Sequence, residues 1–181
     1  MMLHKNFALL ICDLQTKTIP HLYHKKKVIY NVNKLLYMKK YIPEIKVAIN
    51  AEFIPEKLGI LDNSINSSTI DFHYRKDSYS MKNDQLMNYL QKFSISDIIL
   101  TGMETQWCIN QSSHDLAKHF NIYIPYDAIG NKFSNDENKH DLNQLKNNGV
   151  QIMSTDFLIC SFLKTYNEEQ SKKYLEVLKN E

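Results

Sequence analysis

The sequence predicts an α/β fold in which helices cover both faces of a parallel sheet. Apolar runs of strand length alternate along the whole chain with segments whose apolar residues fall at helical spacing. The first run, 7–12, is continuously apolar, which is typical of a strand buried on both faces of a parallel sheet. Three of the strand-like runs are followed closely by an ionisable or nucleophilic residue, and ligand sites in such sheets lie beyond the carboxyl ends of the strands.

The first half of the chain alternates in this way and is interrupted by an irregular region. Pro43 ends the first helical pattern, and residues rich in Ser and Asn mark a loop from Asp62 to Thr69. Asn83 or Asp84 can cap the second helix. The predicted strands cover 7–12, 44–50 and 70–76, the predicted helices cover 26–41 and the segment after residue 83, and an irregular loop passes through Pro55 and Gly59.

The second half repeats the alternation. Gly102 separates the strand at 97–101 from the helix at 105–120, and Gly149 ends a polar helix. A cap at Ser154-Thr155-Asp156 begins another helix, and a charged helix closes the chain. The remaining predicted elements are a strand at 121–126, a helix from Ser134 or Asn135 to about Asn147, and a strand at 150–153.

Composition limits the classes of protein to which the chain can belong. Its 181 residues suit one domain, 1–181, and 43% hydrophobic with 23% charged residues is typical of a soluble globular protein. No apolar stretch reaches the length of a membrane span, and a strand near the N-terminus leaves no room for a leader, so we expect a cytoplasmic protein. A net charge of +2 is low for a nucleic-acid binder, and we read the Lys25–Lys27 run as the solvated start of a helix. With only 4 glycines and no Gly-x-Gly-x-x-Gly motif, we expect no nucleotide cofactor.

Three strand ends carry reactive residues: Asp13, Lys76 and Cys108. In a parallel sheet these ends open onto one edge, so the three side chains can meet. A carboxylate can take the thiol proton, an ammonium can hold both anions, and the helix start near Cys108 favours thiolate. From position alone, Cys108 is equally well read as a small buried residue.

Four segments carry a resemblance to a known family: 10–15, 51–59, 76–81 and 101–109. In order and spacing they resemble the isochorismatase-like cysteine hydrolases, most closely the isochorismatase domain-containing proteins, and the resemblance extends over nearly the whole chain. It implies a three-layer Rossmann-like fold with a six-stranded parallel sheet, and a triad of Asp13 as base, Lys76 as electrostatic partner and Cys108 as nucleophile. It also implies a cis peptide at Met103-Glu104 and an oxyanion hole made by the N–H groups of Glu104 and Cys108.

The chain departs from the nicotinamidases of this family at their metal site. Their Asp-x-His pair is replaced here by Asn50-Ala51-Glu52-Phe53, which contains no histidine, so we expect no metal. His73 lies near the end of the third strand, and a lone histidine is more often a hydrogen-bonded structural residue than a ligand.

Further residues are assigned with their alternatives. The resemblance places Phe53 and Tyr79 near the pocket mouth. Gln15 either contacts substrate or shapes the turn after Asp13, and Trp107 either lines the pocket or packs between helix and sheet, which we favour. Cys12 should point to the other face of its strand from Asp13, so we read it, like Cys160, as an inert core thiol.

Together these observations predict a cysteine-dependent hydrolase that cleaves a C–N bond of a small amide or carbamoyl-type substrate through an acyl-enzyme. The partners we expect are a small-molecule substrate and further copies of the chain, since family members are commonly dimers or larger; we expect neither a membrane nor a nucleic acid. The alternative is a binding or scaffold protein without turnover. It follows from members of the group associated with RNA processing in mitochondria, which would also imply a mitochondrial location.

Overall fold

A computed structural model of the chain describes residues 5–132, 135–147, 149–166 and 168–179. In this part of the chain, seven strands form one sheet in the order β3-β2-β1-β4-β5-β7, with β6 paired to β4, and every pairing between them is parallel. The strands are β1 (Phe7–Cys12), β2 (Ile45–Phe53), β3 (Phe72–Lys76), β4 (Asp97–Met103), β5 (Asn121–Pro125), β6 (Ile129–Gly130) and β7 (Gln151–Met153).

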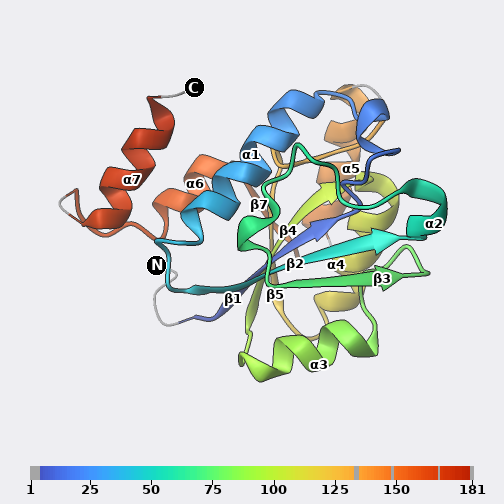
Figure 1. The fold of residues 1–181 in the computed structure, drawn as a ribbon, viewed down its shortest axis with the longest axis horizontal. Helices are drawn as coiled ribbons and strands as arrows, with labels where there is room; N and C mark the ends of the chain where they lie inside the picture. Colours follow the sequence, from blue (N-terminus) through green and yellow to red (C-terminus); the bar gives the residue numbers. More distant parts are fainter. Residues whose placement is uncertain (1–4, 133–134, 148, 167, 180–181) are drawn as a thin grey trace.

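Helices lie on both faces of the sheet, which confirms the three-layer α/β fold (Figure 1). The α-helices are α1 (Lys25–Met38), α2 (Pro55–Leu58), α3 (Asp84–Lys92), α4 (Asn110–Leu116), α5 (Asn135–Asn147), α6 (Thr155–Cys160) and α7 (Glu169–Leu178). Two 3₁₀ turns, η1 (Ile19–His21) and η2 (Ser67–Thr69), and a π-helical turn, η3 (Thr105–Ile109), complete the described elements.

Side-chain alternation along β1 divides the core in two. Phe7, Leu9 and Ile11 belong to the cluster that packs against α1, α6 and α7. Ala8, Leu10 and Cys12 belong to the cluster formed with α3, α4 and α5. Because all six residues of β1 are buried, the strand needs the continuous apolar run seen in the sequence.

The structure corrects three details of the sequence prediction. The sheet has seven strands rather than six, because the chain turns after Pro125 and two residues, too few to show a pattern, pair with the end of β4. The helix expected at 105–120 is divided into η3 and α4. The loop expected through Pro55 contains the short helix α2, which Pro55 begins.

The predicted helix caps at Asn83 and Ser154 are confirmed. The side chain of Asn83 accepts the N–H of Leu86 at 2.9 Å, and that of Ser154 accepts the N–H of Phe157 at 3.1 Å. Ser134, one of two candidates for the start of α5, lies outside the described residues, and the described helix begins at Asn135.

Strand register brings the candidate residues to one edge of the sheet. Cys12 at the end of β1 pairs with Gly102 in β4, and Phe53 at the end of β2 pairs with Lys76 in β3.

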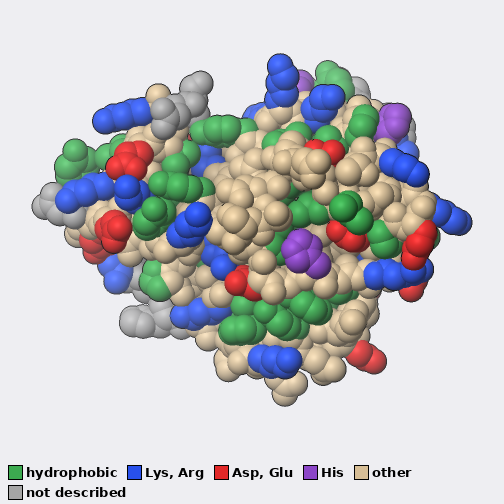
Figure 2. All heavy atoms as spheres, in the orientation of Figure 1, with side chains coloured by type: hydrophobic (Ala, Val, Ile, Leu, Met, Phe, Trp, Pro, Cys, Tyr) green, Lys and Arg blue, Asp and Glu red, His purple; other side chains and the backbone are tan. Residues whose placement is uncertain are grey.

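On the face drawn in Figure 2, the Lys and Arg side chains are interspersed with Asp and Glu. None of the described helices combines the length and the apolarity that crossing a bilayer requires.

Candidate active site

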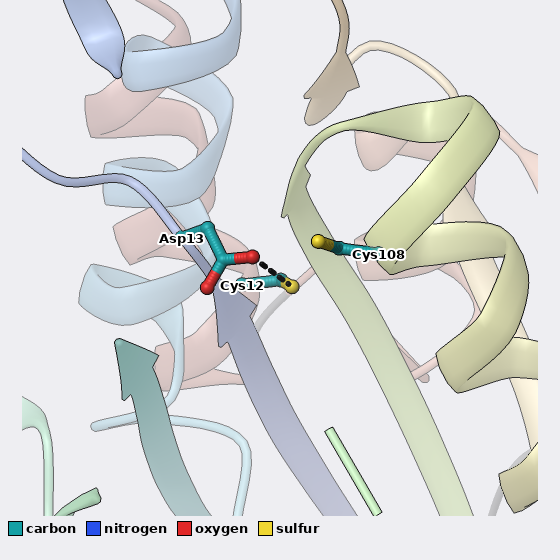
Figure 3. A group of neighbouring side chains, drawn as sticks. All are labelled: Cys12, Asp13 and Cys108. Carbon is teal, nitrogen blue, oxygen red and sulfur yellow. Dashed lines mark hydrogen bonds between the residues drawn. The ribbon is translucent and has the colours of Figure 1, made fainter. Parts of the chain in front are cut away.

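The structure brings Asp13, Lys76 and Cys108 together. The Lys76 Nζ lies 2.8 Å from Asp13 Oδ2 and 3.5 Å from Cys108 Sγ. All three residues are buried, with relative exposures of 4%, 2% and 4%. Figure 3 shows the Asp13 carboxylate, beyond the end of β1, on the side from which the Cys108 sulfur approaches. The predicted meeting of these residues at one sheet edge is therefore observed, while their catalytic roles remain predictions.

The loop after β3 holds the Lys76 ammonium. Besides its two side-chain partners, Nζ donates to the carbonyl oxygens of Ser78 at 3.2 Å and Tyr79 at 3.0 Å. The loop is held in turn by Met81, whose carbonyl accepts the Tyr74 hydroxyl and whose N–H donates to Ser112 Oγ. A buried ammonium with this many acceptors has little freedom to move.

The turn that carries Cys108 depends on Gly102. This residue has φ +110°, and a Cβ there would lie 2.1 Å from the Cys12 carbonyl oxygen, so only glycine lets β4 end this close to β1. The peptide bond between Met103 and Glu104 is cis, as the family resemblance implied. The N–H groups of Trp107 and Ile109 both donate to the Glu104 carbonyl, which shapes η3 around Cys108.

Burial and charge act in opposite directions on the ionisable groups. Burial raises the pKa of Asp13, although the Lys76 charge and hydrogen bonds from Cys108, Lys76 and Cys12 counteract it. Burial acts to lower the pKa of Lys76, but the charges that Cys12, Asp13 and Cys108 carry when they are ionised, together with the hydrogen bond to Asp13, raise it above its ordinary value. Lys76 thus stays an ammonium at neutral pH, and Asp13 is a stronger proton acceptor than an exposed carboxylate.

Three predicted substrate-binding residues form an aromatic row beside Lys76. The Phe53 ring lies 4.6 Å from Lys76 Nζ and 5.4 Å from the Tyr79 ring, which is 6.2 Å from the Trp107 ring. Trp107 is 41% exposed, so the favoured expectation that it packs between helix and sheet is wrong. The Lys132 ammonium lies over the indole, with Nζ 5.1 Å from the centroid of the Trp107 ring.

Gln15 shapes the backbone after β1. Its side-chain amide accepts the Phe53 N–H at 2.9 Å and donates to the carbonyl oxygens of Phe53 and Gly59. The residue is fully buried. The sequence left open whether Gln15 contacts substrate or shapes the turn after Asp13. The structure shows that it shapes the turn, because these hydrogen bonds use the amide oxygen and the amide nitrogen.

The other two cysteines differ from expectation. Cys12 is fully buried, but its thiol lies beside the triad and donates to Asp13 Oδ2 at 3.4 Å. Alternation along β1 correctly places the Cys12 side chain on the face that α3 and α4 cover, and Cys108 lies on that same face. Asp13 has φ 55° and therefore departs from strand geometry, so alternation does not predict where its side chain points. Cys160 is exposed rather than part of the core.

Polar groups fill the place that corresponds to the nicotinamidase metal site. The Asn50 amide contacts Glu52 Oε1 at 3.2 Å and His73 Nδ1 at 3.3 Å, and the same Glu52 oxygen accepts the Leu61 N–H. Within the described residues, the one group of potential metal ligands close enough to share an ion is Cys12, Asp13 and Cys108. His73 belongs to the hydrogen-bonded group of Asn50 and Glu52, and its structural role stays a prediction.

Sequence reasoning did not anticipate the Glu104 side chain. Its Oε2 atom is buried and has no hydrogen-bond partner, and burial raises the pKa of this carboxyl group. The charge and backbone N–H of Lys132 oppose that rise, whereas the Asp13 charge adds to it. Its position directly after the strand end at Met103 was the one signal available.

The parallel sheet and its helical layers define the class of three-layer, Rossmann-like α/β proteins, here with a buried acid, amine and thiol at the edge of the sheet. A family model described as "Isochorismatase domain" matches residues 55–157, more than half of the chain. The protein belongs to the isochorismatase family of hydrolases.

Individual relatives agree with this assignment. Isochorismatase family protein 1B of Dictyostelium discoideum is 28% identical over 182 residues, covering 95% of this chain and 85% of that protein. Isochorismatase domain-containing protein 2 of Danio rerio is 25% identical and covers 96% of this chain and 87% of its own length. The fold is shared with a structure titled MAR1 ribonuclease from Caenorhabditis elegans, at a TM-score of 0.86 and 21% identity, over 96% of this chain and 90% of that one.

Proposed function

We propose that the protein is a cysteine-dependent hydrolase that cleaves the C–N bond of a small amide or carbamoyl-type substrate. The observation that carries the proposal is the Lys76 ammonium between Asp13 Oδ2 and Cys108 Sγ, at 2.8 and 3.5 Å. An ammonium at this place stabilises a thiolate, the reactive form of cysteine. The Asp13 carboxylate, which has an oxygen within 4.8 Å of the same sulfur, can accept the thiol proton.

The reaction follows from these contacts. Asp13 accepts the Cys108 proton, and the thiolate attacks the substrate carbonyl carbon to form a tetrahedral intermediate. We assign its oxyanion to the N–H groups of Glu104 and Cys108. Asp13 returns the proton to the leaving nitrogen as the C–N bond breaks, and an amine and a thioester remain. Asp13 then takes a proton from water, which attacks the thioester and releases the acid and the Cys108 thiol.

Alkylation and turnover test this proposal together. We expect iodoacetamide near neutral pH to label Cys108 well before Cys12, and ammonia release from a panel of primary amides and carbamoyl compounds to stop in Cys108→Ala. Cys160→Ala, which removes the exposed thiol on α6, is the matched control and should keep full turnover. Turnover that survives in Cys108→Ala would end the nucleophile proposal, as would labelling of Cys12 as fast as Cys108.

A hollow beside α1 supports RNA binding as a second candidate function. It has a volume of about 580 Å³, and Lys27 and Lys34 of α1 and the rings of Tyr30 and Tyr126 line it. The Lys27 Nζ lies 6.0 Å from the Tyr126 ring centroid. Lys27 and the Tyr126 ring are exposed, and a cation beside an exposed ring suits single-stranded nucleic acid, in which bases stack and phosphates pair with lysine. Lys34 is buried and paired with Asp156, which also lines the hollow with Asp127, so Lys27 and Tyr126 carry this second candidate.

A fluorescent single-stranded RNA tests this second candidate. Binding should weaken strongly between roughly 50 and 200 mM salt, as phosphate contacts do. It should also weaken in Lys27→Glu combined with Tyr126→Ala, whereas Lys92→Glu on α3 serves as the charge-matched control. Equal binding by the two charge variants, or no response to salt, would rule out this hollow as an RNA site.

A further inference from the structure

The hydrolytic mechanism makes no use of the buried thiol of Cys12. Its sulfur, a carboxylate oxygen of Asp13 and the sulfur of Cys108 all lie within 4.8 Å of one another. Figure 3 shows both sulfur atoms pointing into the same space between β1 and the turn after β4. This closeness joins residues 96 positions apart and follows from the sheet register, since Cys12 pairs with Gly102 just before that turn.

Two kinds of chemistry suit two thiols and a carboxylate: binding of a soft metal ion and formation of a disulfide. The Lys76 ammonium, 2.8 Å from Asp13 Oδ2 and 3.5 Å from Cys108 Sγ, opposes a second cation there. The same ammonium favours the Cys108 thiolate, which is the form that peroxides oxidise. The local charge therefore favours oxidation over metal binding.

The two sulfur atoms lie within 4.8 Å of each other, so a small movement could join them in a disulfide. A disulfide requires the sulfur atoms to approach to about 2 Å, so one or both cysteine side chains must rotate. Cys12 is fixed in the central strand β1, which pairs with β2 and β4. Cys108 lies in the π-helical turn η3, at a strand end, and we expect the adjustment there.

We propose that Cys12 is a resolving thiol that forms a disulfide with Cys108 after a hydroperoxide has oxidised Cys108. Asp13 takes the Cys108 proton, and the thiolate attacks the outer oxygen of the peroxide. The O–O bond breaks, and Asp13 gives the proton to the leaving oxygen, so a sulfenic acid and an alcohol or water result. The Cys12 sulfur then attacks the sulfenic sulfur, the S–O bond breaks, and water leaves. Asp13, which already accepts the Cys12 S–H at 3.4 Å, takes the proton that the Cys12 thiol gives up and passes it to the leaving hydroxide, which departs as water. Both electrons that reduce the peroxide come from the two thiols.

This disulfide would block the nucleophile reversibly. Without a neighbouring thiol, a sulfenic acid can oxidise further to sulfinic acid, which a dithiol does not reduce. With Cys12 in place, dithiothreitol should restore both thiols. The inference shares Cys108 with the proposed hydrolase but does not require that the protein hydrolyse an amide.

Mass spectrometry of the full chain treated with hydrogen peroxide tests the proposal. We expect the wild type and Cys160→Ala to lose two hydrogen atoms, to give a peptide that joins Cys12 to Cys108, and to return to the starting mass in dithiothreitol. Cys12→Ala should instead accumulate several-fold more Cys108 sulfinic acid and form a dimedone adduct. Iodoacetamide labelling of each variant before oxidation shows whether Cys108 is folded and reactive.

The outcomes separate this inference from the hydrolase proposal. A Cys108 that iodoacetamide labels selectively, but that forms no disulfide with Cys12, would overturn the resolving role and leave the nucleophile standing. Sulfinic acid formed equally in the wild type and Cys12→Ala, or a disulfide that involves Cys160, would overturn it as well. A Cys108 that reacts with neither reagent would overturn both proposals.

Discussion

Lys76 joins the three strand ends at the scale of single residues. Its side chain is 1% exposed and paired with the 5% exposed Asp13, so both charges have left water. Burial of one such charge alone would be costly, and the ion pair together with the two loop carbonyls compensates for that cost. The same arrangement places a fixed positive charge beside the Cys108 sulfur.

Replacement of this charge by an apolar side chain of similar length tests its effect on the thiol. We expect Lys76→Met to slow alkylation of Cys108 by iodoacetamide at neutral pH by roughly tenfold or more, because a neighbouring cation stabilises thiolate. Lys172→Met, on an exposed position of α7, is the control and should leave the rate unchanged. An unaltered rate in a folded Lys76→Met protein would show that the ammonium does not activate the sulfur.

At the scale of elements, the end of β4 decides where the reactive turn lies. Gly102 permits the close approach to Cys12, and the chain then enters η3. On the other side of the sheet, α1, α6 and α7 are tied together by Asp156, whose carboxylate accepts Lys34 Nζ at 2.9 Å and the Tyr174 hydroxyl at 2.7 Å. A single substitution, at Gly102 or at Asp156, can therefore test what holds each of these two regions.

A methyl group at Gly102 should displace the turn. We expect Gly102→Ala to lower the free energy of unfolding by about 3 kcal/mol or more, because strain at positive φ adds to a clash with the backbone of β1. Gly149→Ala is a matched control: its φ is +81° but nothing lies within 4 Å of the added carbon, so about 1 kcal/mol is expected. Urea unfolding measures the free energy of unfolding of both variants. An equal loss in the two would contradict the proposal that Gly102 is needed for the close approach of β4 to β1.

The Asp156 contacts should make stability depend on pH. Partial burial acts to raise the pKa of Asp156, but hydrogen bonds from Tyr174 and Lys34 and the Lys34 charge lower it below 3.8. Its stabilisation is therefore present above pH 3.8 and lost as the pH falls through the lowered value. We expect Asp156→Asn to cost about 0.5 to 1 kcal/mol at neutral pH, since the carboxylate is partly exposed, and less in acid. Urea unfolding of the wild type and Asp156→Asn at neutral and at acidic pH measures this effect. The same difference in free energy of unfolding at both pH values would contradict the prediction.

For the whole molecule, β1 is the common wall of two cores. Leu9 packs into the core of α1, α6 and α7, and Leu10 packs into that of α3, α4 and α5. Each side chain is fully buried. A strand that contributes to both cores should make the two layers of helices unfold together.

Replacement of one buried leucine on each face of β1 by alanine tests whether the two layers of helices unfold together. We expect Leu9→Ala and Leu10→Ala each to cost about 2 to 5 kcal/mol, as for other buried leucines. Both variants should unfold in one transition that is the same by circular dichroism and by the fluorescence of Trp107. Separate transitions for the two probes would show that the faces of the sheet are independent, contrary to the expectation of one domain over 1–181.

The sequence by itself determined the order of the elements, the burial of β1 and the presence of Asp13, Lys76 and Cys108 at three strand ends. These follow from local periodicity and from the rule that parallel strands end at one edge. It did not determine β6 or the division of the helix at 105–120, because two paired residues and a π-helical turn leave no distinctive pattern.

Only the tertiary structure decided the immediate neighbours of the reactive sulfur. The face to which Cys12 points follows from alternation, but the presence of Cys108 on that same face depends on the register of β1 with β4 and on the path of the chain after Gly102. Likewise, Trp107 is exposed although Thr105, Cys108 and Ile109 of the same turn η3 are buried, and the Glu104 carboxyl group just before that turn is partly buried. Contacts of this kind join residues far apart in sequence, so no local pattern records them.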